Sequence, residues 1–275
     1  MPRKADDFEL ARTAREAGLG GFVLKSHHVP TADRATLVRQ VVPGVDVLGS
    51  LTLNHFVGGL NPQAVEVAAR LGARVVWLPT VDAANEAGVL ERDPKTRPYW
   101  ATIQAELRQR GHLRPPIAVL DADGRPVPDL LAVLEVVRDH GIALATGHLS
   151  PREIAVVVRA AHDLGIKKII VTHPEFPAVG LTPAQQQELV PYGAVFERSF
   201  STAETGKTSW EAVFAATRAT GPAHNLISTD LGQPHAPYPV EGLALAIRRF
   251  AEAGFDPAVI RMMTVDNPRR LVTPD

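Results

Sequence analysis

Residues 142–152, Ile-Ala-Leu-Ala-Thr-Gly-His-Leu-Ser-Pro-Arg, decide the fold that this sequence predicts. The stretch begins as a short apolar run, which is typical of a strand buried on both faces. It ends where Ser150 can cap a helix, Pro151 suits the first helical turn and Glu153 completes a capping box. His148 is therefore expected at the carboxyl end of a strand, just before a helix. In parallel α/β proteins, ligands and catalytic groups gather at that edge.

The same pattern recurs twice downstream. Residues 169–174, Ile-Ile-Val-Thr-His-Pro, predict a strand that ends at His173, and residues 225–230, Asn-Leu-Ile-Ser-Thr-Asp, predict one that ends at Asp230. Two histidines and an aspartate on three strand ends would face one rim of the sheet. Imidazole and carboxylate groups are common ligands of divalent metals, so the pattern predicts a metal site made by His148, His173 and Asp230.

The spacing of the predicted strands indicates a (β/α) TIM-like barrel. Strands are expected to begin near residues 21, 46, 73, 142, 168, 194 and 225. Outside one long gap, the interval is about 25–30 residues, the size of a strand-plus-helix unit. An open doubly wound sheet is the alternative, but no Gly-x-Gly-x-x-Gly follows a strand, which weakens a dinucleotide-binding interpretation.

The long gap follows the strand predicted at 73–80. Between residues 81 and 128 the alternation breaks, with a helix expected over 99–110 and a hairpin over 117–127 that turns at Asp123-Gly124. This insertion is interpreted either as a lid at the rim of the barrel or as an ordinary surface excursion. Nothing else resembles a linker, so residues 1–275 are expected to form a single domain.

The number of strands raises a question about the start of the barrel. Seven strands are predicted, and the chain opens on an amphipathic helix over residues 6–18. A closed barrel of eight strands would need one more strand before that helix. We therefore expect that a first strand is missing, for which a late start-codon assignment is one explanation. A seven-stranded or partly open barrel is the competing explanation.

Composition narrows the class of protein. The chain has 275 residues, a formal net charge of -1, 45% hydrophobic residues and no cysteine. Near-zero net charge gives no reason to expect nucleic acid or an anionic membrane as a partner. The absence of cysteine excludes disulfides and thiolate chemistry. The N-terminus is charged and no apolar run is long enough to cross a bilayer. We expect a cytoplasmic protein with a small-molecule substrate, and homo-oligomerisation is left open.

Two further basic and imidazole groups follow the first predicted strand. Lys25 and His27 share one face of the extended chain, and His28 lies on the other, so at most one of the two histidines points into a barrel. If Lys25 faces inward, its ammonium could hold a carboxylate or phosphate. A polar loop start is the alternative. His27 is the candidate further metal ligand, and His28 a candidate substrate contact.

Four other polar residues are candidate substrate contacts because they lie at or beyond strand ends. These are His55, Glu175, Arg198 and His235. Each has an ordinary structural alternative, such as capping a loop, packing, or a hydrogen bond at the rim.

The order of short motifs resembles the amidohydrolase superfamily of metal-dependent TIM-barrel hydrolases. The motifs are Gly147-His148-Leu149-Ser150, Thr172-His173-Pro174, Ser228-Thr229-Asp230 and Asn267-Pro268. In that superfamily the fifth and sixth strands end in metal-ligand histidines, and the eighth ends in an aspartate that binds metal and acts as general base. The resemblance implies those roles for His148, His173 and Asp230.

A narrower resemblance is to an uncharacterised bacterial group of that superfamily. It rests on Pro2-Arg3-Lys4-Ala5-Asp6-Asp7, Leu24-Lys25-Ser26-His27-His28 and Thr31-Ala32-Asp33-Arg34. Members carry a His-x-His first strand just upstream of the Pro-Arg-Lys segment. This chain has no such pair on a first strand, and its 73–80 strand ends in Leu-Pro-Thr without a Lys or Glu to bridge two metals. The resemblance therefore implies a single metal ion.

These observations lead to one main hypothesis and two alternatives. The chain is expected to be a metal-dependent hydrolase that cleaves a C–N or ester bond of a small molecule, with one zinc ion, or manganese or iron, and with Asp230 and Lys25 as catalytic residues. One alternative is a single-metal decarboxylase of a small acid. The other is a catalytically degenerate barrel that only binds a ligand.

Overall fold

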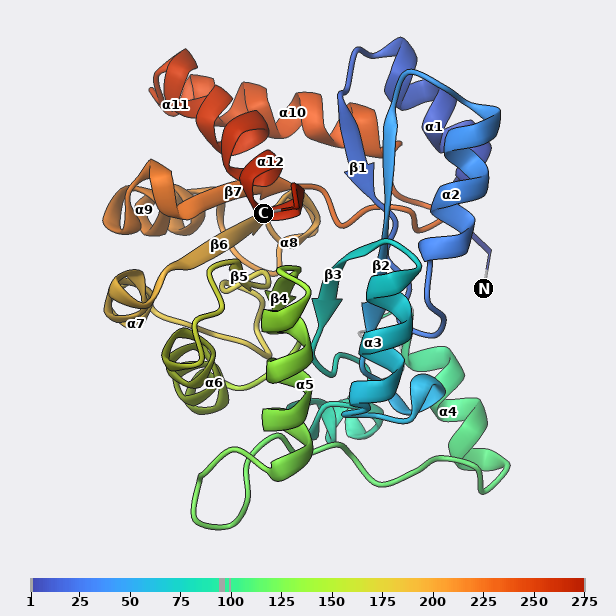
Figure 1. The fold of residues 1–275 in the computed structure, drawn as a ribbon. Helices are drawn as coiled ribbons and strands as arrows, with labels where there is room; N and C mark the ends of the chain where they lie inside the picture. The colour runs from blue at the N-terminus through green and yellow to red at the C-terminus, as the bar shows by residue number, and fades with distance from the viewer. Residues whose placement is uncertain (1, 94–96, 99, 275) are drawn as a thin grey trace.

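The computed structural model describes residues 2–93, 97–98 and 100–274. Its strands form one parallel sheet in which each strand pairs with the next along the chain. The strands are β1 (Gly21–Val23), β2 (Asp46–Thr52), β3 (Ala73–Trp77), β4 (Ala143–Ala145), β5 (Ile169–Val171), β6 (Ala194–Ser199) and β7 (Asn225–Ser228). The seven predicted strands are thus all present, and the sheet curls into a half-barrel (Figure 1).

Helices follow most strands and cover the outside of the sheet. The α-helices are α1 (Asp7–Glu16), α2 (Ala32–Val41), α3 (Pro62–Arg70), α4 (Ala101–Gln109), α5 (Pro128–Asp139), α6 (Pro151–Asp163), α7 (Pro183–Leu189), α8 (Phe200–Glu204), α9 (Trp210–Thr220), α10 (Pro239–Glu252), α11 (Pro257–Arg261) and α12 (Asn267–Val272). Short 3-10 turns are η1 (His55–Val57), η2 (Ala84–Glu86), η3 (Val89–Glu91), η4 (Val190–Tyr192) and η5 (Pro222–His224), and η6 (Met262–Asp266) is a π-helical turn.

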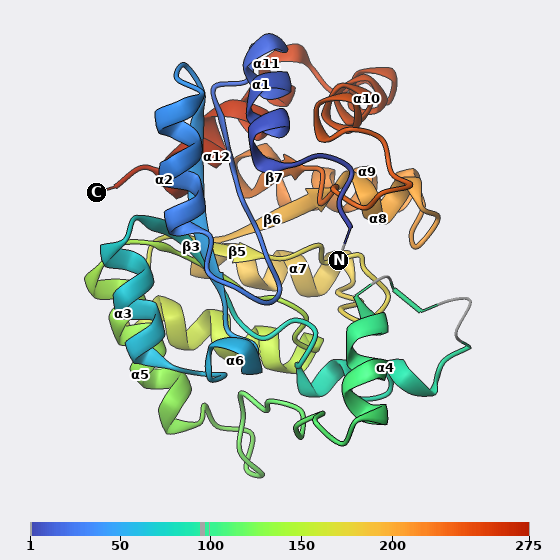
Figure 2. The same cartoon turned by 90° about the vertical axis from the view of Figure 1, so that its right-hand side faces the viewer.

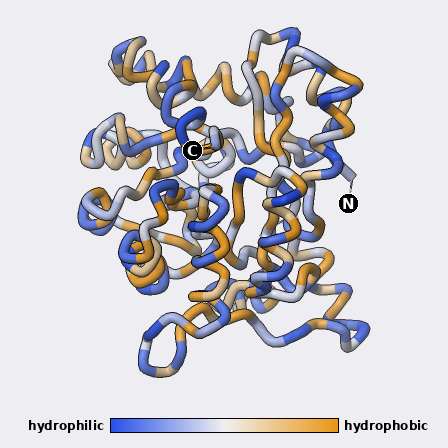
Figure 3. Tube along the Cα trace, in the orientation of Figure 1, coloured by the Kyte–Doolittle hydropathy of each residue, from blue (hydrophilic) through white to orange (hydrophobic). Residues whose placement is uncertain are grey.

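Two apolar layers hold the sheet. The outer layer packs β2 to β6 against α3, α5 and α6. In Figure 3 these helices alternate between hydrophobic and hydrophilic colour, as amphipathic helices with one buried face do. The inner layer lies within the curve of the sheet and consists of Val75, Trp77, Ala143, Ala145, Ile170, Val195, Leu226 and, from α12, Leu271. The concave side is therefore a packed core below its polar rim.

Helix α2 lies unusually close to β2 because of one glycine. A Cβ added at Gly49 would lie 2.4 Å from the Cα of Ala32, the first residue of α2. Only glycine allows that approach without moving the helix.

The two edges of the sheet, β1 and β7, are not paired with each other within the described part of the chain. Helices α1 and α10, together with the segments that lead into them, bridge the two edges. The backbone N–H of Lys4, before α1, donates to the carbonyl of Gly232, before α10, at 3.0 Å, and the hydroxyl of Tyr238, the N-cap of α10, donates to Glu9 of α1 at 2.8 Å. Figures 1 and 2 place α10 and α11 at the end of the molecule opposite α4. A missing first strand stays a prediction.

The insertion after β3 is more irregular than expected. The predicted helix over 99–110 forms as α4, and its expected first residue lies outside the described residues. The predicted hairpin is reduced to a single bridge between Leu120 and Pro126, with the backbone N–H of Asp121 donating to Arg125 at 2.9 Å. The polar Asp-Gly turn closes it as predicted, but the flanking segments are too short to form a ladder.

Among the described residues, none of the helices combines the length and the hydrophobicity that a membrane span requires.

Candidate functional site

The carboxyl ends of β4 and β5 bring two histidine rings together. The ring centroids of His148 and His173 are 5.0 Å apart, and the two side chains are buried. Gly147 makes the turn before His148 with a φ of +63°, and a Cβ there would lie 2.4 Å from the carbonyl oxygen of Leu78. His173 itself adopts a φ of +25°. A positive φ is ordinary for glycine but uncommon for other residues, so the backbone of His173 is in a conformation that often occurs where a side chain is held for function.

A third histidine joins them from the segment after β1. The His27 ring centroid is 5.9 Å from that of His148, and its Nδ1 lies 2.8 Å from the Thr80 hydroxyl. The Asn54 amide donates to that hydroxyl at 2.8 Å and to the His27 carbonyl at 2.9 Å. Because Thr80 already accepts from Asn54, its own hydrogen can be donated to His27 Nδ1, which leaves the ring proton on Nε2. We call His27, His148 and His173 the histidine cluster.

His28 has a separate environment. Its ring packs edge-on against Phe56 with centroids 4.6 Å apart, and both ring nitrogens are buried without a hydrogen-bond partner. The two adjacent histidines therefore contact different neighbours, as the alternation of an extended chain implies.

Burial controls the charge of these rings. The pKa of His27 is lowered well below its usual value by burial first and then by the positive charge of Lys25. Burial likewise lowers the pKa of His173 well below its usual value, with smaller effects from His148 and Lys25. The pKa of His28 is also lowered, mainly by burial. His27 and His173 are therefore neutral near pH 7 and can accept a proton or bind a cation.

The insertion supplies an acidic partner that the sequence did not indicate. Glu86 Oε1, from η2, lies 3.0 Å from His148 Nδ1, and the Glu86 side chain is fully buried. The neighbouring Asn85 amide donates to the His148 carbonyl at 3.1 Å. Two rings complete the surroundings of His148: Trp100 with its centroid 6.1 Å away and Phe176, nearly parallel, at 6.0 Å.

Charged groups from other strand ends border the histidine cluster. The Lys25 ammonium lies 5.1 Å from the centre of the Trp77 ring, on the concave side of the sheet. Glu197, partly buried on β6, has a raised pKa because of burial and the charge of Asp230, against the opposing effect of Lys25. Asp230 has a φ of +49° and accepts a hydrogen bond from the Ser201 hydroxyl at 3.3 Å. The position of Glu197 at this rim went unpredicted.

Lys207 is a second residue that the sequence did not reveal. Its ammonium lies 4.8 Å from the centre of the Phe176 ring, which in turn contacts His173 with centroids 4.8 Å apart. Burial lowers the Lys207 pKa, while Asp230 and Glu86 act to raise it. Lys207 comes from the loop after α8, which carries no motif or periodicity.

The structure does not bring Arg198 and Glu175 to the histidine cluster. Arg198 is fully buried and pairs with Glu175, and it donates to Asn225 at 2.7 Å and to Gln186 at 2.8 Å. These partners lie on the outer side of the sheet, between β6 and the helices α7 and α9. The alternation of β6 explains this placement, because Glu197 faces the concave side and its neighbour Arg198 must face the other.

His55 and His235 also lie apart from the cluster. The His55 ring bonds to the carbonyl of Pro115 at 2.7 Å, and its backbone N–H donates to Asp82 at 2.8 Å, so it ties the loop after β2 to the insertion. His235 is exposed on the segment after β7.

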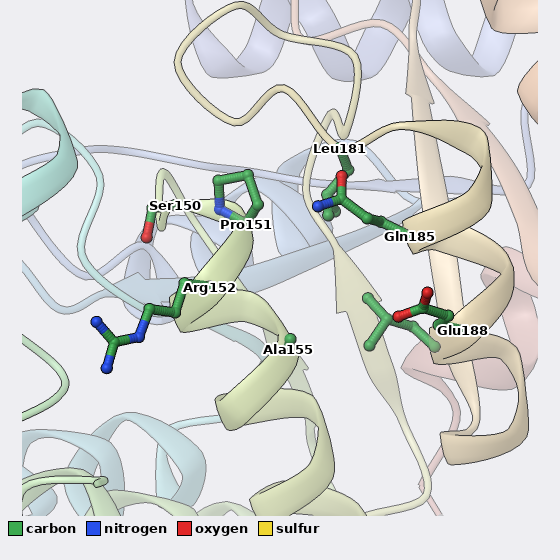
Figure 4. A pocket seen from close by; sticks show the side chains of 8 residues that line it. Ser150, Pro151, Arg152, Ala155, Leu181, Gln185 and Glu188 are labelled. Atoms are coloured by element: carbon green, nitrogen blue, oxygen red, sulfur yellow. The ribbon is translucent and has the colours of Figure 1, made fainter. Parts of the chain in front are cut away.

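A cavity of about 420 Å³ lies elsewhere, between α6 and α7 (Figure 4). It is lined by Ser150, Pro151, Arg152, Ala155, Leu181, Gln185, Glu188 and Leu189. No histidine of the cluster lines it, so we place the candidate site at the rim.

The donors at the rim fit a divalent metal only in part. Within the described ranges, no three His, Cys, Asp or Glu side chains lie close enough together to hold an ion. His173 Nδ1 is buried and has no hydrogen-bond partner, so its lone pair could coordinate a cation. His148 lies beside it, whereas His27 Nδ1 is occupied by Thr80. Two imidazoles therefore fit, and a third protein ligand is not in place.

Solved structures of hydrolases and of a decarboxylase share the fold. An amidohydrolase from Pseudomonas aeruginosa is 12% identical, with a TM-score of 0.60 over 98% of this chain and 92% of that one. The organophosphorus hydrolase from Deinococcus radiodurans is 15% identical, with a TM-score of 0.56 over 97% and 82%. A 2,6-dihydroxybenzoate decarboxylase is 11% identical, with a TM-score of 0.57 over 98% and 88%. At these identities the likeness shows the fold alone, and it agrees with the resemblance to amidohydrolases.

Among curated proteins, no match is found. A sequence model of one family covers residues 1–197, including β1 to β5 and most of β6. The chain therefore belongs to the family described as "Family of unknown function (DUF6282)".

Proposed function

We propose that this protein is a hydrolase of the amidohydrolase type that cleaves a C–N or ester bond of a small molecule at the rim of the sheet. The observation that supports this most directly is the histidine cluster. It brings imidazoles from three strand ends together, those of His148 and His173 being buried, and the lowered pKa of His27 and of His173 keeps both rings neutral near pH 7. Neutral imidazoles at such an edge suit acid–base chemistry and cation binding.

In this proposal, Asp230 is the general base. It accepts a proton from the attacking water and returns it to the leaving group. Its partner Ser201, 3.3 Å away, orients the carboxylate. Lys25 holds an anionic group of the substrate from the concave side. His148 and His173 bind a divalent cation, zinc with manganese and iron as alternatives, and such a cation would supply Lewis-acid polarisation of the scissile group.

The metal and the base are tested together. Metal content is measured by plasma mass spectrometry on the purified chain and on the Asp230→Asn and His148→Ala variants, alongside hydrolysis of a panel of esters, lactones and amides. We expect near-stoichiometric metal that falls in His148→Ala. Turnover should be lost in Asp230→Asn while circular dichroism is unchanged. Turnover that survives Asp230→Asn would overturn the assigned base.

A decarboxylase of a small acid is a second candidate. The Lys25 ammonium lies 5.1 Å from the centre of the Trp77 ring, so a cation and an aromatic plane adjoin one another, which suits an aromatic acid. One structure of the same fold is the 2,6-dihydroxybenzoate decarboxylase in complex with its substrate. Release of carbon dioxide from 2,6-dihydroxybenzoate or a related acid, without hydrolysis of the ester panel, would favour this candidate.

A catalytically degenerate barrel is the third candidate, because the described part of the chain places no third metal ligand. Tight small-molecule binding without metal or turnover would support it. The outer edges of β1 and β7 are where the further strand predicted from the sequence would pair.

A further inference from the structure

We propose that the concave face of the sheet, beside the histidine cluster, holds a subsite for the carboxylate of an anionic substrate, with Lys25, Trp77 and Thr52 as the donors. This inference rests on the proposed function for the use of the subsite in a reaction. It also names the substrate class, which is small molecules that carry a carboxylate besides the bond that is cleaved. Binding of a carboxylate to the resting protein does not depend on the reaction that follows.

Two of these side chains are neighbours on adjacent strands. Thr52, the last residue of β2, pairs in register with Trp77, the last residue of β3, and adjacent strands lie about 4.8 Å apart. Trp77 belongs to the inner apolar layer, whereas Leu51 and Leu53 pack in the outer one. Because side chains alternate along a strand, Thr52 shares the concave face with Trp77.

Both of these side chains bury a polar atom that has no partner. Trp77 is 7% exposed and Thr52 is 2% exposed, and within the described part of the chain neither the indole Nε1 nor the Thr52 hydroxyl has a hydrogen-bond partner. An indole N–H can only donate, and burying it without an acceptor costs free energy. A valine would fill the space of Thr52 without that cost. Two unpaired donors on adjacent strands therefore indicate a ligand that brings acceptor oxygens.

Lys25 supplies the positive charge. It follows Val23 by two residues, Val23 packs against the inner layer, and the Lys25 ammonium lies 5.1 Å from the centre of the Trp77 ring. Among the described residues, no carboxylate reaches salt-bridge distance of this ammonium. The side chain is half-buried and has a flexible stem. It can therefore swing off the ring, admit a ligand to the two buried donors and turn its ammonium onto that ligand.

The charges around this position favour a carboxylate over a phosphate. One ammonium balances one negative charge, whereas a phosphate monoester carries about −1.5 to −2 near pH 7. Glu197 also faces the concave side, and Lys25 acts to lower its raised pKa, so this acidic side chain lies within reach of the same ammonium. The second charge of a phosphate would have no counter-ion and would approach Glu197.

The test observes the Trp77 indole N–H directly by two-dimensional ¹H–¹⁵N NMR of tryptophan-labelled protein. Three tryptophans give three indole signals, and the spectra of Trp77→Phe and Trp210→Phe assign two of them. Sodium acetate is titrated at constant ionic strength, and sodium phosphate is titrated in parallel. We expect acetate to move the Trp77 signal downfield and to saturate, while Trp210, in a separate apolar cluster, is unaffected. If acetate leaves the Trp77 signal in place, or if phosphate binds more tightly than acetate, the proposal is wrong.

The Thr52→Val variant separates binding from structure. It removes a hydroxyl that has no partner in the resting protein, so the midpoint of urea unfolding should be unchanged or raised. The Kd for acetate should nevertheless rise at least about 10-fold, as loss of one hydrogen bond to a charged group does. Lys25→Met should raise this Kd by at least as much. Reduced stability with an unchanged Kd in Thr52→Val would make the hydroxyl structural and would overturn the proposal.

The matched control is Lys4→Met, which removes an ammonium that lies 5.2 Å from the centre of the Tyr238 ring. This contact is of the same kind as that of Lys25 with Trp77, but it lies at the bridge between α1 and α10. The Kd for acetate should therefore be unchanged. An equal rise of the Kd in Lys4→Met and Lys25→Met would reduce the effect to net charge and refute the subsite.

Failure of this proposal and failure of the proposed function give different results. If no ester, lactone or amide is hydrolysed, the proposed function fails, while acetate binding still decides the subsite. If hydrolysis is found without acetate binding, only the subsite is refuted. Where both are found, substrates with a free carboxylate should have a kcat/KM at least about 10-fold higher than their methyl esters, and Thr52→Val should reduce that preference.

Discussion

Replacing Arg198 by methionine tests whether this fully buried charge has a structural or a functional role. Arg198 was a candidate substrate contact in the sequence, but its guanidinium faces the outer side of β6. There it pairs with Glu175 and donates to Asn225 at 2.7 Å, Gln186 at 2.8 Å and Thr220 at 3.2 Å. Methionine has a similar length and no charge, so the change removes all four interactions with little change in packing volume.

The expected loss follows from burial. The side chain of Arg198 has no exposure and that of Glu175 is 8% exposed, so the substitution leaves a carboxylate buried without its counter-ion. Breaking a buried pair from one side typically costs about 3–5 kcal/mol of unfolding free energy. At about 2–4 °C per kcal/mol for a domain of this size, the Tm should fall by about 6–20 °C.

Urea unfolding followed by circular dichroism measures this free energy, provided that the slope with denaturant is unchanged. The matched control is Arg34→Met, which breaks the exposed pair with Asp7 and should cost less than about 1 kcal/mol. The double variant Arg198→Met/Glu175→Met should recover part of the loss, because it leaves no charge buried alone. A loss in Arg198→Met as small as that in the control, or a loss of turnover at unchanged stability, would refute this reasoning.

Three further outcomes are expected. The pKa of His173 in the folded protein is well below its unfolded value of about 6.5, mainly because the ring is buried. His173 therefore contributes stability that is complete above about pH 6.5 and is lost as the pH falls from there. The dependence of the urea midpoint on pH should accordingly be shallower in His173→Asn. Gly147→Ala should cost about 3 kcal/mol or more by thermal unfolding because its Cβ meets two carbonyl oxygens, whereas Gly165→Ala, with nothing within 4 Å, should cost about 1–2 kcal/mol. Asn54 is fully buried, and Asn54→Ala should lower the free energy of unfolding by about 2–4 kcal/mol and alter the NMR signals of His27. Unchanged His27 signals would show that Asn54 does not hold this histidine in place.

The strand pattern could be predicted because its physical cause is local. A parallel strand covered on both faces must be apolar throughout, so short runs such as Ile169–Val171 stand out in the sequence. His148 and His173 could be found by the same logic, since they directly follow β4 and β5. The curl of the sheet and the bridging of its edges by α1 and α10 depend on contacts between distant segments, which no local pattern indicates.

The side-chain partners could be predicted less well. Glu175 and Arg198 looked alike as polar residues near strand ends, and only the register of β6 separates the inward Glu197 from the outward Arg198. Side chains two residues apart on a strand lie on the same face, so Arg198 shares the outer face of β6 with Phe196, which packs in the outer layer. Asn54 and Thr80 follow β2 and β3, but their role depends on one another and on His27, so neither is informative alone.

The insertion illustrates why the site could not be completed from sequence, and also how it works. The sequence of residues 81–128 supports either a lid or a surface excursion, because it lacks a repeating pattern. In the structure they carry Glu86 to His148 and Trp100 to the same ring, and Val89, Leu90 and Trp100 share a buried apolar cluster of their own. Moving this segment away would expose that apolar cluster to water and would separate the Glu86 carboxylate from the His148 imidazole, and both changes cost free energy. We therefore propose that the described part of this segment forms a wall of the candidate site, and we expect changes in it to alter what the histidine cluster binds without altering the sheet beneath.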